Sequence, residues 1–183
     1  MEKKRYRDII LQILSICLLL FCGFVFWQYG YSVTKIGKYI CLIAFSIYIA
    51  GVDKREFRIP NKTLIYMLLL RAGILLIEFF LYPAIWTGFM IHTACGMSVG
   101  FGVLFICYYL SKKSIGMGDV KFCGVIGAYT GAGLVYVIII ISCIAAAVYG
   151  VIQVLRKKMT VKEGIPFGPF LLIGIVSSLL IGF

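Results

Sequence analysis

Two aspartates occupy positions where an acid is unusual in so apolar a chain. Asp53 follows the apolar run "YIAGV", and Asp119 follows two glycines in "GMGD" at the start of another apolar run. A carboxylate at lipid depth is costly, so both acids need an explanation. Two carboxylates held close together share one proton, because neighbouring like charges cannot both ionise easily. The ionised acid can then activate a water while the protonated acid polarises a peptide carbonyl, which is metal-free peptide hydrolysis.

Both acids also have an ordinary structural interpretation. Acids at helix ends commonly lie in the headgroup region without any chemical role. Asp119 at a helix start could cap that helix and complement its dipole. The spacing alone leaves both interpretations open. Of the other acids, Glu78 lies within an apolar run. The rest fall in the N-terminal tail or in charged loops; these are Glu2, Asp8, Glu56 and Glu163.

The composition indicates a membrane protein. Of the 183 residues 62% are hydrophobic and only 14% are charged, whereas soluble domains carry about 25% charge. We therefore expect an all-α, polytopic bundle of membrane helices in a single domain, residues 1–183. The expected spans are Ile9–Tyr29, Ile36–Val52, Thr63–Tyr82, Gly88–Leu110, Val120–Thr130, Leu134–Leu155 and Ile165–Phe183. The alternative of six spans joins the fifth and sixth, but Gly131 and Gly133 favour a break between them.

The basic residues behind the net charge of +11 are distributed as the expected topology predicts. With the N-terminus in the cytoplasm, fourteen Lys and Arg residues fall in segments on the cytoplasmic side, and only Lys35 and Lys38 fall outside. Positive residues gather on the cytoplasmic side of membrane proteins. This distribution accounts for the charge without nucleic-acid binding. It also places Asp53 and Asp119 at the same, cytoplasmic end of their spans.

The sequence offers no pattern for a metal or a disulfide. All seven cysteines lie in apolar runs without a C-x-x-C pair, so we expect no disulfide, no metal site and no cofactor. The single histidine, His92, falls at the opposite end from the two aspartates, near Glu78, and we expect these two to form a structural polar pair. Arg71, in mid-span, must face the interior of the bundle or a wet cavity.

Three segments resemble those of type IV prepilin peptidases. "GMGD" with Val120 and Lys121 resembles the signature G-x-G-D-x-K. "DKREFRIPN", from Asp53 to Asn61, is similar to an aspartate followed after five residues by Ile-Pro-Asn. "IPFGPFLLIG", from Ile165, resembles the C-terminal I-P-F-G-P-F segment. The resemblance covers residues 36–183, the peptidase-like core, and leaves residues 1–35 as an additional N-terminal membrane helix and loop.

The resemblance implies an integral-membrane aspartyl endopeptidase of the bacterial inner membrane. Such an enzyme clips the leader peptides of prepilin or pseudopilin precursors at the cytoplasmic face, so its partners would be those precursors and membrane lipid. Asp53 and Asp119 carry over as the catalytic pair. The supporting motif residues are Gly116, Gly118, Lys121, Ile59, Pro60, Asn61, Pro166, Gly168 and Pro169. Many members also carry a cytosolic insertion with paired C-x-x-C motifs and N-methylate the new pilin N-terminus; that insertion is missing here, so we expect no methyl transfer.

The supporting residues also have physical interpretations. Pro60 disfavours helix at Ile59, and Asn61 could cap the helix that follows. Lys121 could stabilise an ionised Asp119 or extend towards lipid phosphate. The prolines around Gly168 predict a non-helical start to the last span, Pro166 to Pro169, which could bind an extended substrate through main-chain hydrogen bonds.

Two rival classes bear on the same residues. Intramembrane proteases of the presenilin kind have a Y-D motif on one helix and a P-A-L motif in a second segment. This sequence has "VD" and "PFGPF" in their place, so that class is disfavoured. The second is an inactive family member, or a small membrane transporter or scaffold. A transporter should place its acids nearer the middle of the bilayer, so Asp53 and Asp119 at one face favour the peptidase.

Overall fold

Every regular element in residues 2–111, 115–156 and 164–181, the part of the chain that the computed structural model describes, is helical. The fold class predicted from composition is therefore confirmed. The α-helices are α1 (Glu2–Gln28), α2 (Val33–Glu56), α3 (Asn61–Leu81), α4 (Trp86–Leu110), α5 (Met117–Thr130), α6 (Ala132–Leu155) and α7 (Gly168–Ile181), with the 3₁₀ turn η1 (Pro83–Ile85) before α4.

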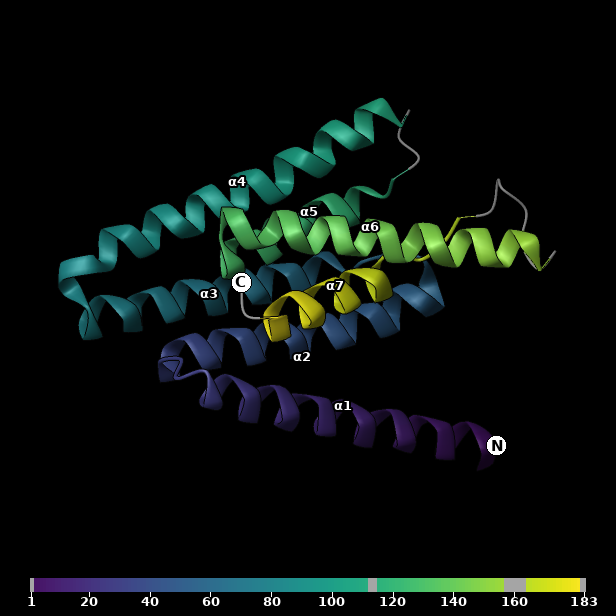
Figure 1. Ribbon diagram of the computed structural model, residues 1–183, viewed down its shortest axis with the longest axis horizontal. Helices are drawn as coiled ribbons and strands as arrows, with labels where there is room; N and C mark the ends of the chain where they lie inside the picture. The colour runs from purple at the N-terminus through teal and green to yellow at the C-terminus, as the bar shows by residue number, and fades with distance from the viewer. Residues whose placement is uncertain (1, 112–114, 157–163, 182–183) are drawn as a thin grey trace.

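Successive helices run back and forth along the long axis of the molecule (Figure 1). The α1–α2 and α3–α4 connections lie at one end of the bundle. The links from α2 to α3, from α4 to α5 and from α6 to α7 lie at the other end, together with the N-terminus. This arrangement gathers the motif-bearing segments at one end. The basic loop residues Lys112, Lys113, Lys157, Lys158 and Lys162, used in the topology prediction, lie outside the described residues.

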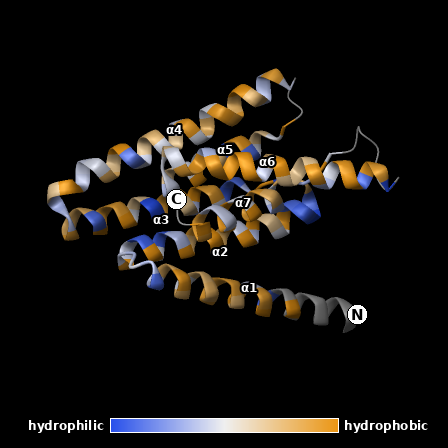
Figure 2. Ribbon diagram, in the orientation of Figure 1, coloured by the Kyte–Doolittle hydropathy of each residue, from blue (hydrophilic) through white to orange (hydrophobic). Residues whose placement is uncertain are grey.

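Apolar residues run along the full length of the helices (Figure 2). Three α-helices, α2, α3 and α6, and the segment Pro83–Leu110 are each long and apolar enough to cross a membrane. Their outward surfaces carry many exposed large apolar side chains, including Leu69 and Ile144. Exposed apolar surface of this extent suits a lipid environment. The chain thus has the fold of a polytopic helical membrane protein.

Helix α5 is short and enclosed by the rest of the bundle. It has 14 residues, and every residue from Phe122 to Thr130 is buried. It ends at Gly131, whose φ of 83° lies in the left-handed region that favours glycine. A Cβ at Gly131 would also overlap the imidazole of His92. The expected break between the fifth and sixth spans is therefore present, and the alternative of one continuous helix from Val120 to Leu155 is wrong.

Close backbone packing holds α5 against α4. A Cβ added at Gly96 would overlap the carbonyl oxygen of Gly127, and one added at Gly100 would overlap the carbonyl of Cys123. Gly96 and Gly100 have the small-xxx-small spacing that lets membrane helices approach closely. The N-cap of α5, Gly116, lies three residues before Asp119. The packing of α5 on α4 therefore helps to fix the position of that acid.

A buried polar cluster ties α3 to α4 and α5. Arg71 is only 2% exposed. Its guanidinium donates to Glu78 Oε2 at 3.0 Å, to Thr93 Oγ1 at 2.7 Å and to the carbonyl oxygen of Ala128 at 3.0 Å. The prediction that Arg71 faces the interior is confirmed. The predicted pair between Glu78 and His92 is wrong, because Arg71, two helical turns away on the same face of α3, forms the ion pair with Glu78 instead.

Candidate active site

Asp53 lies in the last turn of α2 and is 4% exposed. The helix ends three residues later, at Glu56, and Phe57 caps it in the left-handed conformation, its N–H donating to the Asp53 carbonyl at 2.9 Å. The non-helical residues 57–60 then separate α2 from α3, as the proline predicts. This early end keeps Asp53 in regular helix and turns the chain back towards the bundle.

The Asp53 carboxylate lies at the N-terminus of α7. Its Oδ2 accepts a hydrogen bond from the backbone N–H of Gly168 at 2.8 Å. A Cβ added at Gly168 would lie 3.0 Å from Oδ2 and 3.1 Å from the Asp53 Cβ. A larger residue at this point would require the carboxylate or the start of α7 to shift by a few tenths of an ångström. A helix N-terminus carries unpaired N–H groups and a partial positive charge, so this position stabilises a negative carboxylate.

Asp119 occupies the first turn of α5. The N-cap of this helix is Gly116, which has no side chain to cap it. Asp119 lies in the first turn, where an acid complements the helix dipole as its structural interpretation expects, and the backbone N–H of Gly116 acts on its carboxyl. A Cβ added at Gly116 would lie 2.9 Å from Asp119 Oδ2, which explains a glycine three residues before the acid. The other oxygen, Oδ1, is buried without a hydrogen-bond partner in the described part of the chain. A buried unpaired carboxyl oxygen is costly and is typical of a functional position.

The structure brings the two acids together from helices far apart in the sequence. The Asp53 carboxyl acts electrostatically on that of Asp119, and α2 contacts α5 directly. Both acids lie at the end of the bundle that holds the α2–α3, α4–α5 and α6–α7 links (Figure 1). Carboxyl groups that lie close enough to affect each other's charge can share one proton.

The segments around the two acids contact each other as well. A Cβ at Gly118 would lie 3.1 Å from the Ile59 Cβ, so the glycine lets the start of α5 pack on the α2–α3 link. Lys121 Nζ donates to Asn61 Oδ1 at 3.4 Å. Asn61 was expected to cap α3, but Pro60 is the N-cap and no side-chain cap bond forms. Asn61 accepts from Lys121 instead, and this contact joins α3 to α5.

The last motif segment has the shape that its prolines predict. Residues 164–167 are non-helical, and α7 begins at Gly168. The carbonyl of Phe167 accepts the first bonds of the helix, from Phe170 at 3.0 Å and Leu171 at 3.1 Å. Pro166 precedes this helix, and Pro169 lies in its first turn, where a proline costs no intrahelical bond. The segment thus aims the Gly168 N–H at Asp53.

The two carboxyl groups of the site are not part of a larger cluster of metal-ligating side chains in the described residues. Within residues 2–111, 115–156 and 164–181, no three His, Cys, Asp or Glu side chains lie close enough together to hold a metal ion. The seven cysteines are free thiols, and His92 lies near the opposite end, by the α5–α6 turn. The groups gathered at the site are therefore two carboxyls, one backbone N–H and the Lys121–Asn61 contact.

Comparison with known proteins agrees with the motifs. Residues 40–151, more than half of the chain, match the model of the type IV leader peptidase family. The chain belongs to the type IV leader peptidase family. The match includes both Asp53 and Asp119. Family membership and the apolar helices together indicate a multi-pass membrane protein.

Three bacterial relatives are 27–30% identical to this chain over the aligned residues. A prepilin leader peptidase/N-methyltransferase of Stutzerimonas stutzeri is 27% identical over 163 residues, which cover 84% of this chain and 52% of the relative. One of Xanthomonas campestris is 30% identical over 153 residues, covering 80% and 50%. Leader peptidase HopD of Escherichia coli is 29% identical over 113 residues, covering 53% and 73%. The chain spans about half the length of the first two relatives. No solved structure matches it.

Sequence reasoning missed one feature of this family member's site. Gly168 was singled out as part of a motif, yet its N–H was not expected to bond Asp53, 115 residues earlier in the chain. The signal was present in "PFGPF", because a glycine at a helix N-terminus can admit a carboxylate close to the backbone. Which acid it would receive depends on how α2 and α7 pack, and the sequence does not specify that.

Proposed function

We propose that this chain is a membrane aspartyl endopeptidase that removes leader peptides from prepilin-like precursors, with Asp53 and Asp119 as its catalytic pair. The observation that carries the proposal is the position of these two carboxyls at one end of the bundle (Figure 1), on the contacting helices α2 and α5, with the Gly168 N–H bonded to Asp53. Family membership supports a peptidase, and the names of the relatives support prepilins as the substrate class.

The surroundings of the two acids suggest a role for each. Asp53 accepts an N–H bond at a helix N-terminus, so it is the better placed to be ionised and to act as general base. Asp119 has a buried oxygen without a partner, so it is the better placed to hold the proton and to act as general acid.

The reaction then follows from this division of roles. Asp53 takes a proton from water as the water oxygen bonds to the scissile carbonyl carbon, and Asp119 donates its proton to the carbonyl oxygen. In the resulting tetrahedral intermediate the C–N bond breaks. The proton held by Asp53 passes to the leaving nitrogen, and a hydroxyl proton of the intermediate returns to Asp119 as the new carboxyl product forms.

The site faces the end of the bundle where a membrane-anchored precursor would present its leader. We place that end at the cytoplasmic face of the bacterial inner membrane, because Lys54, Arg55, Arg58 and Lys62 all lie there and such residues favour the cytoplasmic side. The non-helical residues 164–167 lie beside Asp53 and offer backbone groups to an extended substrate strand. These features support a cut near the membrane surface.

Methyl transfer is not part of the proposed activity. Two of the relatives described above are named for a second, N-methyltransferase activity, but the link between α1 and α2, residues 29–32, leaves no room for a cysteine-rich insertion at that point. The alternative of an inactive family member or a small transporter or scaffold predicts no cleavage at all, so one assay separates it from the peptidase.

Co-expression tests the proposal. This chain is expressed with a prepilin-like precursor in bacteria that lack their own prepilin peptidase, and the precursor is analysed by intact-protein mass spectrometry. We expect the precursor to lose its leader at a single peptide bond and its new N-terminus to carry no added methyl group. A panel of pilin, pseudopilin and Flp-type precursors that all remain at full length would contradict the proposed activity.

A further inference from the structure

A second polar site lies at the opposite end of the bundle from Asp53 and Asp119. It is a cavity of about 600 Å³ between the starts of α2 and α4, the end of α3 and the α5–α6 turn. This volume falls in the range of ~300–1,000 Å³ that is usual for small-molecule sites. Its polar lining comes mainly from Ser32, Thr34, Lys35, Lys38, Glu78 and His92. The proposed peptidase mechanism uses none of these residues.

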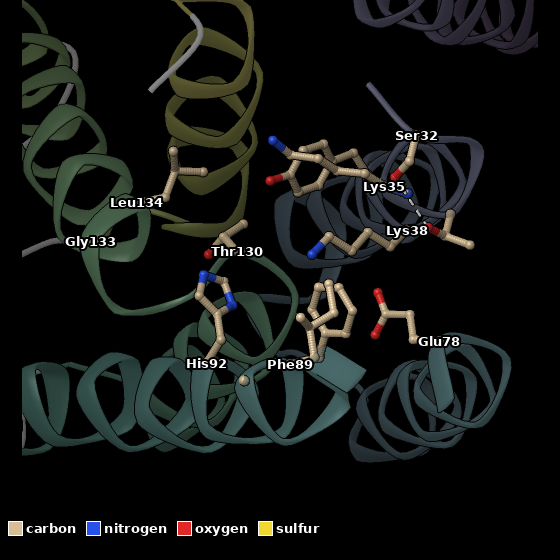
Figure 3. Close-up of a pocket in the computed structure, with 13 residues that line it drawn as sticks. Ser32, Lys35, Lys38, Glu78, Phe89, His92, Thr130, Gly133 and Leu134 are labelled. Carbon is tan, nitrogen blue, oxygen red and sulfur yellow. Dashed lines mark hydrogen bonds between the residues drawn. The ribbon is translucent and has the colours of Figure 1, made fainter. Parts of the chain in front are cut away.

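The central observation is the environment of the Lys38 side chain. The residue is 7% exposed, yet in the described part of the chain its ammonium has no hydrogen bond or ion pair, only the Tyr39 ring at 5.3 Å. Figure 3 shows its side chain extending from α2 into the cavity, with the His92 ring entering from α4. A buried ammonium without a counter-charge is expensive in a membrane protein. Among the described residues, no acid forms a hydrogen bond or an ion pair with Lys38.

The one acid in the cavity lining does not supply that partner. Glu78 forms its ion pair with Arg71 at 3.0 Å, both residues being buried. These two charges compensate each other and leave Lys38 unmatched. Lys35 adds a second positive charge, and its Nζ lies 3.7 Å from the centre of the Tyr31 ring. The described lining residues thus carry a surplus of positive charge around an enclosed space.

We propose that this cavity binds a phosphate anion, with Lys38 as the central contact and Lys35 and His92 as further donors. Ammonium groups bind phosphate strongly as point charges. The donors approach from two different helices, α2 and α4, which suits a tetrahedral anion with several acceptor oxygens. The hydroxyls of Ser32 and Thr34, which lie 3.2 Å from each other, add polar contacts at the rim.

The phosphate has two possible sources, a phospholipid headgroup and free phosphate. The position favours the headgroup, since Lys35 and Lys38 lie in the first turns of α2, a helix long enough to cross the membrane. Phospholipid phosphates lie at such helix ends, and basic pockets between membrane helices bind lipid headgroups. Either source would place one anion against Lys38.

Thermal unfolding of the purified full chain in a neutral detergent tests the site. Phosphatidylglycerol, diacylglycerol with the same acyl chains, and inorganic phosphate are titrated separately, with sodium chloride added to match ionic strength. Phosphatidylglycerol should raise the Tm in a saturable way, while diacylglycerol should not, because it lacks the phosphate. A rise with inorganic phosphate as well would show that the anion suffices without the acyl chains. An equal rise with diacylglycerol, or no rise with either phosphate, would overturn the proposal.

Matched variants assign the effect to the cavity. Lys38→Met should weaken the response about tenfold or more, because it removes a charged donor, whereas Lys38→Arg should keep most of it. Lys62→Met, an exposed lysine at the other end of the bundle, should respond as the unmodified chain. If Lys38→Met does not yield a monodisperse folded protein, Lys35→Met provides the same comparison. An unchanged response in Lys38→Met, or in Lys35→Met where that variant replaces it, would refute the site and leave the peptidase proposal untouched, since no cleavage is measured.

Discussion

The backbone N–H of Gly168 donates to the carboxylate of Asp53 at 2.8 Å, across 115 residues of sequence. This bond joins the last turn of α2 to the first residue of α7. It also sets Asp53 apart from Asp119, one of whose oxygens is buried without a partner in the described chain. The two acids therefore lie in different environments, and that difference is what an acid–base pair requires.

Gly168→Ala should inactivate the enzyme while leaving it folded. The new Cβ would lie 3.0 Å from Asp53 Oδ2, so the carboxylate or the start of α7 must shift by a few tenths of an ångström or more. Small misplacements of catalytic groups cost up to about 100-fold in rate. Leader cleavage in a purified assay measures the loss. Gly73→Ala, on α3, is the matched control, since nothing lies within 4 Å of the position of its Cβ; equal activity of the two variants would contradict the proposed fit around Asp53.

The contact between Lys121 and Asn61 should position the catalytic pair rather than stabilise the fold. Its atoms are exposed and 3.4 Å apart, and exposed polar pairs contribute about 0–1 kcal/mol to stability. We expect Lys121→Met and Asn61→Leu each to lower kcat with little change in Tm. The double variant should be no slower than the slower single variant, because both remove the same contact. Strictly additive losses in rate would show that the two residues act separately.

The ion pair between Arg71 and Glu78 should matter for stability and not for chemistry. Arg71→Met leaves the Glu78 carboxylate buried and unpaired, which costs about 3–5 kcal/mol. The double variant with Glu78→Met should recover part of that loss. Denaturant unfolding in detergent measures both. Arg58→Met, whose side chain is 76% exposed, should change stability by less than about 0.5 kcal/mol. A single Arg71→Met variant as stable as this control would contradict the structural role of the pair.

Activity should depend on pH with an optimum and a fall on both sides. The general base must be ionised, so the rate falls at low pH where that carboxylate takes up a proton. The general acid must be protonated, so the rate also falls at high pH where that carboxyl loses its proton. The kcat/KM profile over a wide pH range measures this. A rate that rises to a plateau and stays there at high pH would contradict a mechanism that needs a protonated carboxyl.

Inhibitors should separate this chemistry from its alternatives. EDTA should leave the rate of leader cleavage unchanged. If EDTA abolished cleavage and added zinc restored it, the proposed mechanism would be contradicted. Thiol reagents should have little effect as well. Cys123 lies one helical turn beyond Asp119, but it is fully buried against α4, so a reagent cannot reach it in the folded protein. Serine-directed reagents should also leave the rate unchanged.

Much of the fold could be predicted from the sequence, because its signals are local. Apolar runs of membrane length predicted the helices, and Gly131 predicted the break after α5, where the structure has a positive φ. Basic loops predicted which ends lie together, and with them the position of Asp53 and Asp119 at one end. Each of these inferences needed only a short window or a count along the chain.

The remaining contacts depend on how the helices are rotated about their axes. Glu78 pairs with Arg71 rather than with His92, and Asn61 accepts from Lys121 instead of capping its own helix. The spacing of seven residues between Arg71 and Glu78 did place them on one helix face. The sequence predicted that Arg71 faces the interior of the bundle or a wet cavity, but it did not show that this face would pack against Ala128.

The central claim is that Asp53 and Asp119 together carry out the cleavage. Its most direct test measures leader removal from a co-expressed precursor by Asp53→Asn, Asp119→Asn and the control Glu56→Gln, an exposed acid three residues after Asp53. We predict that both asparagine variants accumulate in the membrane to normal levels and leave the precursor at full length. The Glu56→Gln variant should process it fully. Normal processing by either asparagine variant would contradict the account.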